Sequence, residues 1–292
     1  MARARRRKGT ERLNTSSEFW REGSVPAQVA ALAVSTSWDG ALPHVQGMLQ
    51  RDGNDASAAC RSRAVAVELL AALPEQCFSK GFNVPPSRRE HFDKYLRDAS
   101  AGVLGVLTQL VGWASTDARP ADAAGAAKLT STAFECLRAW ISFCDVPAAA
   151  LAASPLLPGA FDALQHPPLA DVATDVIVEA LRRYDCRDAA AQPLVAAVAP
   201  RVMALVPRLE TARRNDDDDA ALGLCRLFCE MGEAYMPMIC SSADCDQASI
   251  VAVMLACTEY PCRKVAQIPL RFWRVPPRGC FSRTGSRRLP RG

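Results

Sequence analysis

The sequence predicts an all-α protein, a right-handed α-solenoid of antiparallel helix pairs, on three observations. Aromatic residues make up only 7% of the 292 residues, while Ala and Leu recur throughout, and this composition favours helices over sheets. Apolar residues recur at helical spacing, without sustained alternation of apolar and polar residues. The strongest apolar stripes also return at a regular interval along the chain.

Charge divides the chain into three parts. The net charge is +4, but residues 1–12 carry +5 and residues 271–292 carry +7, which leaves −8 between them. We expect residues 1–23 to be a disordered basic leader, 24–274 the solenoid and 275–292 an irregular Arg-, Pro- and Gly-rich tail. A nuclear-localisation cluster and a transit peptide are alternative interpretations of the leader. The acidic body suits basic partners and argues against a nucleic-acid groove.

The first part of the body predicts three helices and a long joint. The helices are expected over 26–35, over 38–51, and from 58 to a stop near Pro74. The joint from 75 to 86 is rich in Gly, Pro and Asn, which are typical of irregular connections.

Two strongly amphipathic helices follow this joint. The stripe of the first, after Pro86, consists of Phe92, Tyr95, Leu96, Ala99, Val103, Val106, Leu107 and Leu110. The second, entered from a loop that contains Asp122, has the stripe Ala133, Cys136, Leu137, Trp140, Ile141 and Cys144.

Prolines interrupt the segments that come next. A weaker stretch over 147–165 precedes a helical stripe over 169–181. Segment 190–214 is expected to be bent or broken, because Pro193 fits an opening turn whereas Pro200 and Pro207 interrupt a helix.

Four consecutive carboxylates, Asp216 to Asp219, come before the next apolar stripe. They suit a helix start, where exposed N–H groups and the helix dipole stabilise negative charge; the alternative is a cation site, although calcium loops interleave their ligands over a longer span. A final helix pair is expected over 246–258 and 261–274.

The strongest helices are centred on Leu137, Ile177, Phe228 and Pro269. Their separation of about 40 to 50 residues is the period of HEAT and armadillo repeats. A single helix pair of this kind cannot bury its apolar stripe alone, so stacked pairs share one continuous core and present long faces to proteins and peptides.

The sequence offers no cofactor, metal or catalytic motif. The 12 cysteines contain no CxxC, and only His44, His91 and His166 could join them as ligands. Five cysteines fall on apolar helical faces and are expected to be core thiols of a protein in a reducing compartment. These are Cys136, Cys144, Cys225, Cys229 and Cys257. No apolar run approaches the ~20 residues that span a bilayer.

Five strings of residues occur in the same order as in a known family. Leu70 to Gln76, Asn83 to Arg89, Cys136 to Trp140, Leu224 to Met231 and Ile268 to Trp273 resemble helices of the transportin-SR branch of the importin-β superfamily. The collinear resemblance covers about residues 26–273.

The resemblance implies a nuclear transport receptor rather than an enzyme. Such a receptor shuttles between cytoplasm and nucleus, binds Ran-GTP and FG-repeat nucleoporins, and carries Ser/Arg-rich splicing factors or other basic cargo, without contacting nucleic acid or membrane. The matched strings are expected to be packing positions, so no partner-binding residue is assigned from them.

The chain also departs from the family pattern. The Arg-rich start is unlike the usual N-terminal repeat, and the composition changes abruptly after Trp273. We expect an internal fragment or a truncated gene model, with exposed apolar faces that promote association. The alternatives are a HEAT scaffold that assembles another complex without Ran and an enzyme with a Cys-based site.

Overall fold

The computed structural model describes residues 25–36, 39–49, 56–78, 85–116, 123–241 and 247–274. The predicted leader, the tail and the loop residue Asp122 lie outside these ranges. Every element of the described residues is helical and none is a strand, so the all-α prediction is confirmed. Within the predicted solenoid the chain divides into two compact units, with the division between Phe92 and Asp93.

The first unit contains α1 (Val25–Thr36), α2 (Ala41–Leu49), α3 (Ala56–Phe78) and the start of α4 (Pro86–Thr116). Both α1 and α2 pack on α3. Small side chains on α1, such as Ala30 and Ala33, are buried, and their size lets the helices approach closely.

The prediction that the third helix stops near Pro74 is wrong. Helix α3 continues through this proline to Phe78. Proline removes one backbone donor, but Leu73 before it and Cys77 after it are fully buried, so continuing the helix keeps apolar surface out of water. The predicted joint is correspondingly shorter, because Pro85 already accepts hydrogen bonds from the backbone N–H groups of Arg88 and Arg89 at the start of α4.

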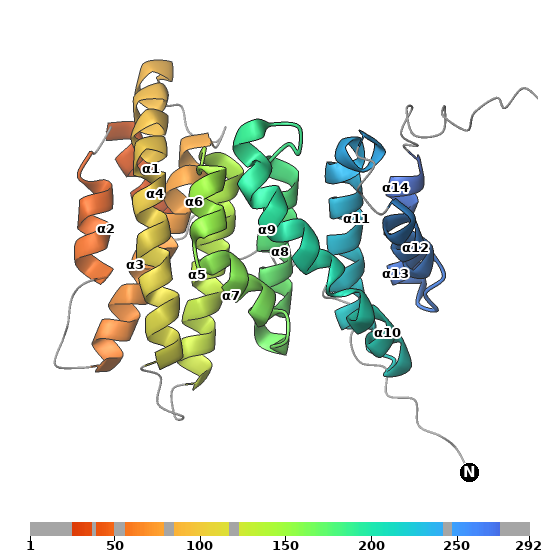
Figure 1. The fold of residues 1–292 in the computed structure, drawn as a ribbon. Coiled ribbons are helices and arrows are strands. Elements are labelled where there is room, and N and C mark those ends of the chain that lie inside the picture. Colours follow the sequence, from red (N-terminus) through yellow and green to blue (C-terminus); the bar gives the residue numbers. More distant parts are fainter. Residues whose placement is uncertain are drawn as a thin grey trace, which may run out of the picture. The chain divides into compact units, whose positions relative to one another are not determined.

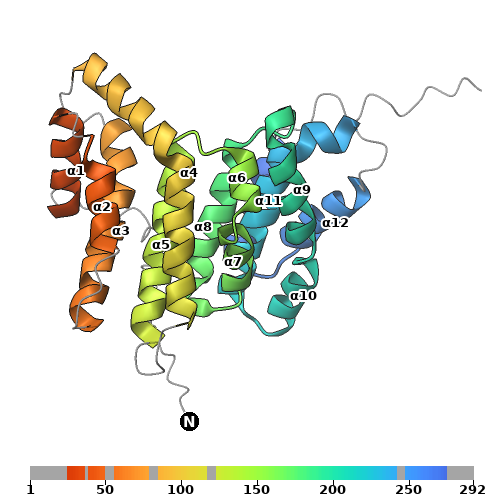
Figure 2. The same ribbon diagram turned by 60° about the vertical axis from the view of Figure 1, so that its left-hand side comes forward.

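The second unit contains the rest of α4 and ten further α-helices among its described residues. They are α5 (Ala123–Phe143), α6 (Ala148–Ala153), α7 (Leu156–Ala163), α8 (Pro167–Arg183), α9 (Gln192–Met203), α10 (Val206–Arg214), α11 (Asp218–Ser241), α12 (Gln247–Thr258), α13 (Arg263–Ala266) and α14 (Leu270–Arg274). Figures 1 and 2 show the part of α4 in this unit beside α5.

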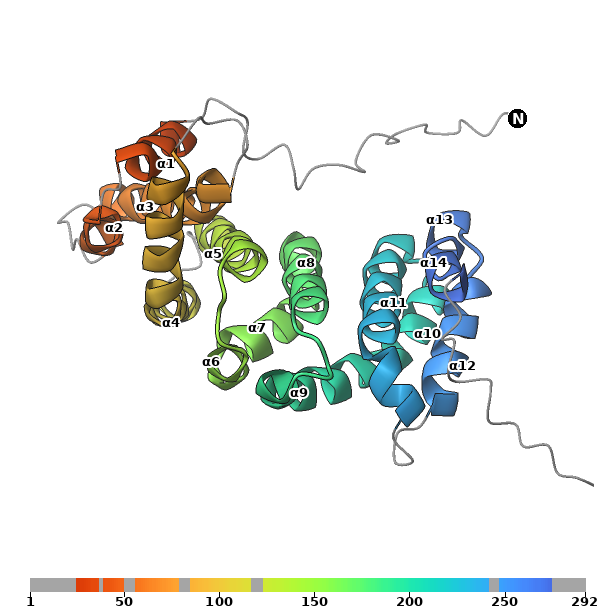
Figure 3. The same ribbon diagram turned by 90° about the horizontal axis from the view of Figure 1, so that it is seen from above.

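The helices of the second unit form two layers. We call α5, α8, α11 and α14 the B layer, and α6, α7, α9, α10 and α12 the A layer. Helix α8 packs between α5 and α11, and α14 packs on the other side of α11. Viewed from above, α5, α8 and α11 form one row, while α6 and α9 belong to the other (Figure 3). The HEAT-type stacking predicted from the repeat period is confirmed.

Apolar stripes account for this packing. In α8, Ala173, Val176, Ile177, Ala180 and Leu181 are buried, as predicted. The thiols of the five cysteines expected in the core are buried as well. Three stripe positions of α4, Tyr95, Ala99 and Val106, are only half-buried.

Prolines divide the A layer into short helices, and segment 190–214 is broken, as predicted. Pro200, however, does not interrupt a helix: it lies inside α9, which continues to Met203. Pro193 lies in the first turn of α9 and Pro207 in the first turn of α10, with a break at Ala204 and Leu205 between the two helices.

The stretch Ala189–Arg214 is, among the described residues, long and apolar enough to cross a membrane by composition. It is nevertheless broken, and α9 packs on α6 and α11 through buried apolar residues, so it serves as core.

The last predicted helix, 261–274, is also broken, and here the prediction is wrong. Helices α13 and α14 are separated by turn residues 267–269. Pro269 begins α14, since its carbonyl accepts the N–H of Trp273 at 3.1 Å. A proline that opens a helix loses no intrahelical bond, and this favours a new helix over a continued one.

Two glycines of the second unit test how closely the helices pack. A Cβ at Gly102 would meet nothing within 4 Å, whereas one at Gly232 would lie 3.1 Å from Cε2 of Phe272 on α14. We expect Gly102→Ala to raise the free energy of unfolding by about 0.5–1 kcal/mol through helix propensity. Gly232→Ala should lower it, because the Phe272 ring must move. Chemical denaturation measures both, and equal stabilisation by the two variants would contradict the close packing.

Candidate partner-binding face

Charged side chains join α4 and the turn after α5 to α8, then α8 to α11 and α11 to α14, and form what we call the ion-pair ladder. Its members are Asp93, Arg97, Asp145, Asp175, Arg182, Arg183, Arg226, Glu230, Glu233 and Arg271. All of them lie in the second unit.

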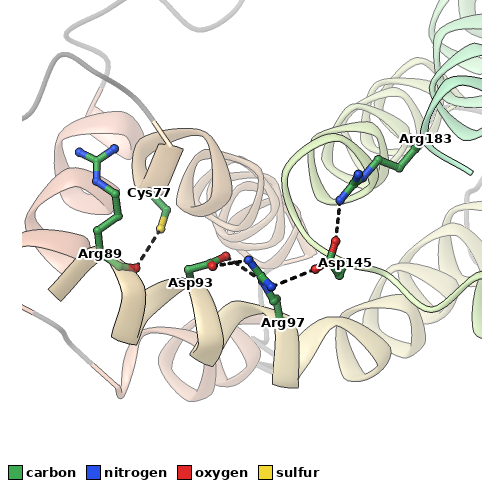
Figure 4. A network of polar contacts seen from close by, with 6 residues as sticks. All are labelled: Cys77, Arg89, Asp93, Arg97, Asp145 and Arg183. Atoms are coloured by element: carbon green, nitrogen blue, oxygen red, sulfur yellow. Dashed lines mark hydrogen bonds and ion pairs between the residues drawn. The ribbon is translucent and has the colours of Figure 1, made fainter. Parts of the chain in front are cut away.

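The first part of the ladder centres on Asp145, in the turn after α5. Its carboxylate accepts Nη1 of Arg97 at 3.0 Å and Nη2 of Arg183 at 2.5 Å, so it joins α4 to the end of α8 (Figure 4). Arg97 also pairs with Asp93 one turn earlier on α4, and this hydrogen bond raises the pKa of Arg97. Asp145 therefore accepts two guanidinium groups from two helix pairs.

Tyr184 holds the same turn from the end of α8. Its hydroxyl donates to the carbonyl of Val146 at 2.7 Å. Burial raises the pKa of Tyr184 to about 12, so the hydroxyl keeps its proton and this hydrogen bond at all physiological pH values.

Two ion pairs join α8 to α11. Arg182 donates to both carboxylate oxygens of Glu230, with Nε to Oε2 at 2.8 Å. Nη2 of Arg226 lies 2.6 Å from Oδ1 of Asp175. The carboxylate side chains are mostly buried, 15% exposed for Glu230 and 16% for Asp175, while both arginines are more exposed.

The polarity of these two pairs fixes the register of α8 against α11. On α8 the acid Asp175 precedes the base Arg182 by seven residues. On α11 the order is reversed, because the base Arg226 precedes the acid Glu230 by four residues. Sliding α11 by one turn would bring Glu230 towards Asp175, two like charges in a partly buried setting. The pairs therefore specify one alignment, which apolar contacts alone do not.

Glu233 and Arg271 continue the ladder to α14, with Nε of Arg271 3.2 Å from Oε2 of Glu233. Burial raises the pKa of Glu233, and the neighbouring Glu230 raises it further, while Arg271 and Arg182 oppose the rise. Two carboxylates thus share the guanidinium groups at this point.

Additional negative charge lies on α8 beside the ladder. Asp171, Asp175 and Glu179 are spaced four residues apart and so share one helix face. Asp171 is exposed and Glu179 half-exposed. With polar side chains from four helix pairs and a carboxylate stripe, this surface suits a basic protein segment.

Residues of several matched strings are packing positions, as expected, but the described part of the string Asn83 to Arg89 is mostly exposed, and three ladder residues lie within other strings. Leu137 and Trp140 of one string and Phe228 of another are buried. Arg226 and Glu230, however, lie within the string Leu224 to Met231, Arg271 lies within the string Ile268 to Trp273, and all three belong to the ladder. Sequence reasoning missed them, although the four-residue spacing of Arg226 and Glu230 on the polar side of an amphipathic helix was visible.

The acidic run before α11 acts as a helix start. The Asp217 side chain accepts the N–H of Ala220 at 3.1 Å, and Asp218 and Asp219 occupy the first turn. Asp216 has φ 53°, a left-handed conformation that aspartate tolerates and that reverses the chain after α10. The helix-start interpretation is confirmed, and the described residues contain no cluster able to hold a metal ion.

Stacked helix pairs with a polar face define an α-solenoid of the HEAT type, and comparisons with known proteins identify its family. Residues 25–177, more than half of the chain, match the model described as Exportin 1-like protein. Residues 216–275 match the model described as Transportin-3/Importin-13 second TPR domain. The chain therefore belongs to the Exportin 1-like family within the importin-β superfamily, and with this membership the prediction of a non-enzymatic protein is confirmed.

Individual relatives agree with this assignment. Transportin MOS14 of Arabidopsis thaliana is 26% identical over 212 residues, 71% of this chain and 20% of the relative. Importin-13 of Gallus gallus is 24% identical over 255 residues, 84% of this chain and 25% of the relative. The chain thus spans between a fifth and a quarter of the length of these curated relatives.

A solved structure of importin-13 in its cytosolic state shares the fold. Its TM-score is 0.69 at 18% identity, over 86% of this chain and 30% of that chain. At this identity the likeness establishes the fold alone.

A double-mutant cycle on Asp175 and Arg226 tests the ladder. Asp175→Asn and Arg226→Gln should show a coupling free energy of about 0.5–1 kcal/mol, since the pair is only partly buried. At roughly 1 M NaCl, where the Debye length is about 3 Å, the coupling should shrink. Thermal or urea unfolding of wild type, the two single variants and the double variant measures the coupling free energy. The absence of coupling at low salt would show that this ion pair does not stabilise the protein.

The raised pKa of Glu233 predicts a pH dependence of stability. A carboxyl whose pKa is higher in the folded state binds its proton more tightly there, so stability is lost as pH rises from the ordinary value of 4.5 through the folded pKa. Glu233→Gln should therefore unfold at a slightly higher temperature at neutral pH and lose this advantage below 4.5.

Asp185 provides a control of opposite sign. Its hydrogen bonds with Arg187 lower its pKa from 3.8 to about 2. Its contribution is therefore present above 3.8 and lost as pH falls towards 2. Asp185→Asn should be less stable than wild type at neutral pH only; the same pH trend in both variants would contradict the assignment.

Proposed function

We propose that this chain is part of a nuclear transport receptor that binds Ran-GTP and carries Ser/Arg-rich or other basic protein cargo between cytoplasm and nucleus, passing FG-repeat nucleoporins. The observation that carries the proposal is the family match over residues 25–177, continued by the Transportin-3/Importin-13 match over 216–275. The relatives, a transportin and an importin, point in the same direction.

The polar B-layer face supports a basic cargo. Glu179 on α8 and Glu233 on α11 lie close enough to Arg182 to raise its pKa, and Asp171 is exposed on the same face of α8 as Glu179. An Arg-rich segment brings planar donors that form paired hydrogen bonds with carboxylates. Arginines of the cargo can therefore replace ladder arginines as partners of the same carboxylates.

The first experiment is a pull-down of the chain with Ran loaded with GTP and, in parallel, with GDP. We expect retention by the GTP form only. Retention by both forms or by neither would contradict Ran control by this chain. A stable partner that ignores the nucleotide would instead support the scaffold alternative.

A second arm tests the cargo surface. Asp171→Lys with Glu179→Lys should weaken binding of an Arg/Ser-repeat peptide, measured by fluorescence anisotropy, at least tenfold. Asp162→Lys with Glu210→Lys, at two exposed acids of the A-layer helices α7 and α10, makes the same change of charge outside the ladder; it is the matched control and should bind like wild type. An equal loss of peptide binding in both variants would show that net charge alone causes the effect.

A further inference from the structure

Sulfur atoms gather where α11 packs on α12. Cys225 and Cys229 lie four residues apart on α11. Met254 and Cys257 lie three residues apart on α12, so each pair shares one face of its helix. All four side chains are at most 4% exposed, and the three thiols are free. The sequence predicts these cysteines as core thiols, but burial alone does not require sulfur at four neighbouring positions.

The register of the two helices pairs these sulfur atoms in two levels. Sγ of Cys229 lies 3.8 Å from Sδ of Met254. Only residues 242–246 separate α11 from α12, and helices joined by so short a connection run antiparallel. One turn back along α11 from the first level is therefore opposite one turn forward along α12, which places Cys225 opposite Cys257. The thiols of Cys225 and Cys257 are hydrogen-bonded to each other, in agreement with this register.

The packing of α12 on α11 keeps these thiols protonated. The hydrogen bond with Cys257 and burial raise the pKa of Cys225, and burial raises the pKa of Cys229. The thiolate is the species that attacks a disulfide, so these thiols react slowly while the two helices are packed. Cys262 before α13 is half-buried and provides a more accessible thiol for comparison. Cys225 and Cys257 therefore react when α12 separates briefly from α11.

We propose that Cys225 and Cys257 form a reversible disulfide that fixes α12 on α11 under oxidising conditions. When the helices separate, one thiol loses its proton and attacks the S–S bond of a small disulfide, such as glutathione disulfide. One glutathione leaves as its thiol, and a mixed disulfide remains on the protein. The second protein thiol then displaces the other glutathione and its proton passes to it, so two protein thiols are oxidised and one disulfide is reduced to two thiols.

The position of this pair lets the disulfide act on more than α12. Met254, one turn from Cys257, lies 3.8 Å from the place of a Cβ on Gly232, a place that the Phe272 ring of α14 approaches to 3.1 Å. Fixing α12 therefore also holds the contact at which α11, α12 and α14 meet. In a reducing compartment, disulfides of this kind are transient and sense the redox state. This inference does not rest on the proposed transport function.

Oxidation of the full chain with glutathione disulfide tests the proposal. After digestion at acidic and basic residues, mass spectrometry should find the peptides of Cys225 and Cys257 joined, and dithiothreitol should separate them. A cross-link restricts the unfolded chain, so the oxidised protein should melt at least about 3 °C higher than the reduced protein. Cys225→Ala and, separately, Cys257→Ala should lose this rise. Cys229→Ala is the matched control and should keep both the cross-link and the rise, because Cys229 faces a thioether.

Four outcomes would overturn the proposal. In the first, Cys262 reacts fully with glutathione while Cys225 and Cys257 stay unlinked. In the second, either of these two is joined to a different cysteine. The third is a cross-link without a rise in melting temperature, and the fourth is a rise that persists in Cys225→Ala. Each variant is compared with its own reduced form, and the mass spectrometry of wild type needs no variant, so a less stable alanine variant does not affect the test.

Discussion

The structure depends on one constraint: no helix pair of this chain can bury its apolar face by itself. Helix α8 shows the consequence, because it packs against α5 on one side and α11 on the other. Val176 and Ile177 are fully buried between these neighbours. Each helix pair is therefore stable only as part of the stack, and every surface that the chain presents is determined by which neighbour covers which side.

Apolar burial and charge have different roles in the stack. Burial is favourable in many alignments because it has little direction. Alignment is set by contacts that allow no sliding: Gly232 under the Phe272 ring, Gly223 under Oγ1 of Thr174, and the oppositely ordered Asp175–Arg226 and Arg182–Glu230 pairs. The ladder therefore adds specificity of register more than stability, as partly exposed ion pairs usually do.

The sequence predicted those features that depend on neighbours within one helix. The stripes of α5, α8 and α11, and the helix start at Asp217, follow from spacings of three to seven residues. Pro74 was misjudged, because tertiary burial of Cys77 outweighs a local penalty. The prediction of a continuous helix over 261–274 was wrong, because Pro269 precedes a new helix instead of lying at the centre of one. The ladder could not be derived, since Arg182 and Glu230 are 48 residues apart and meet only after stacking.

The division of labour between the layers explains why the B layer suits a partner. A-layer helices are short and interrupted, as at Ser154, which lies between α6 and α7 and whose hydroxyl accepts the N–H of Leu156. Helices α5, α8 and α11 are longer than the A-layer helices. A charged partner of the kind proposed would compete on this face for side chains whose mutual pairing is worth only about 0.2–1 kcal/mol each. Little free energy is then needed for the partner to replace one side chain of a ladder ion pair. Because these ion pairs join consecutive helix pairs, the replacement acts directly on the spacing between the helix pairs.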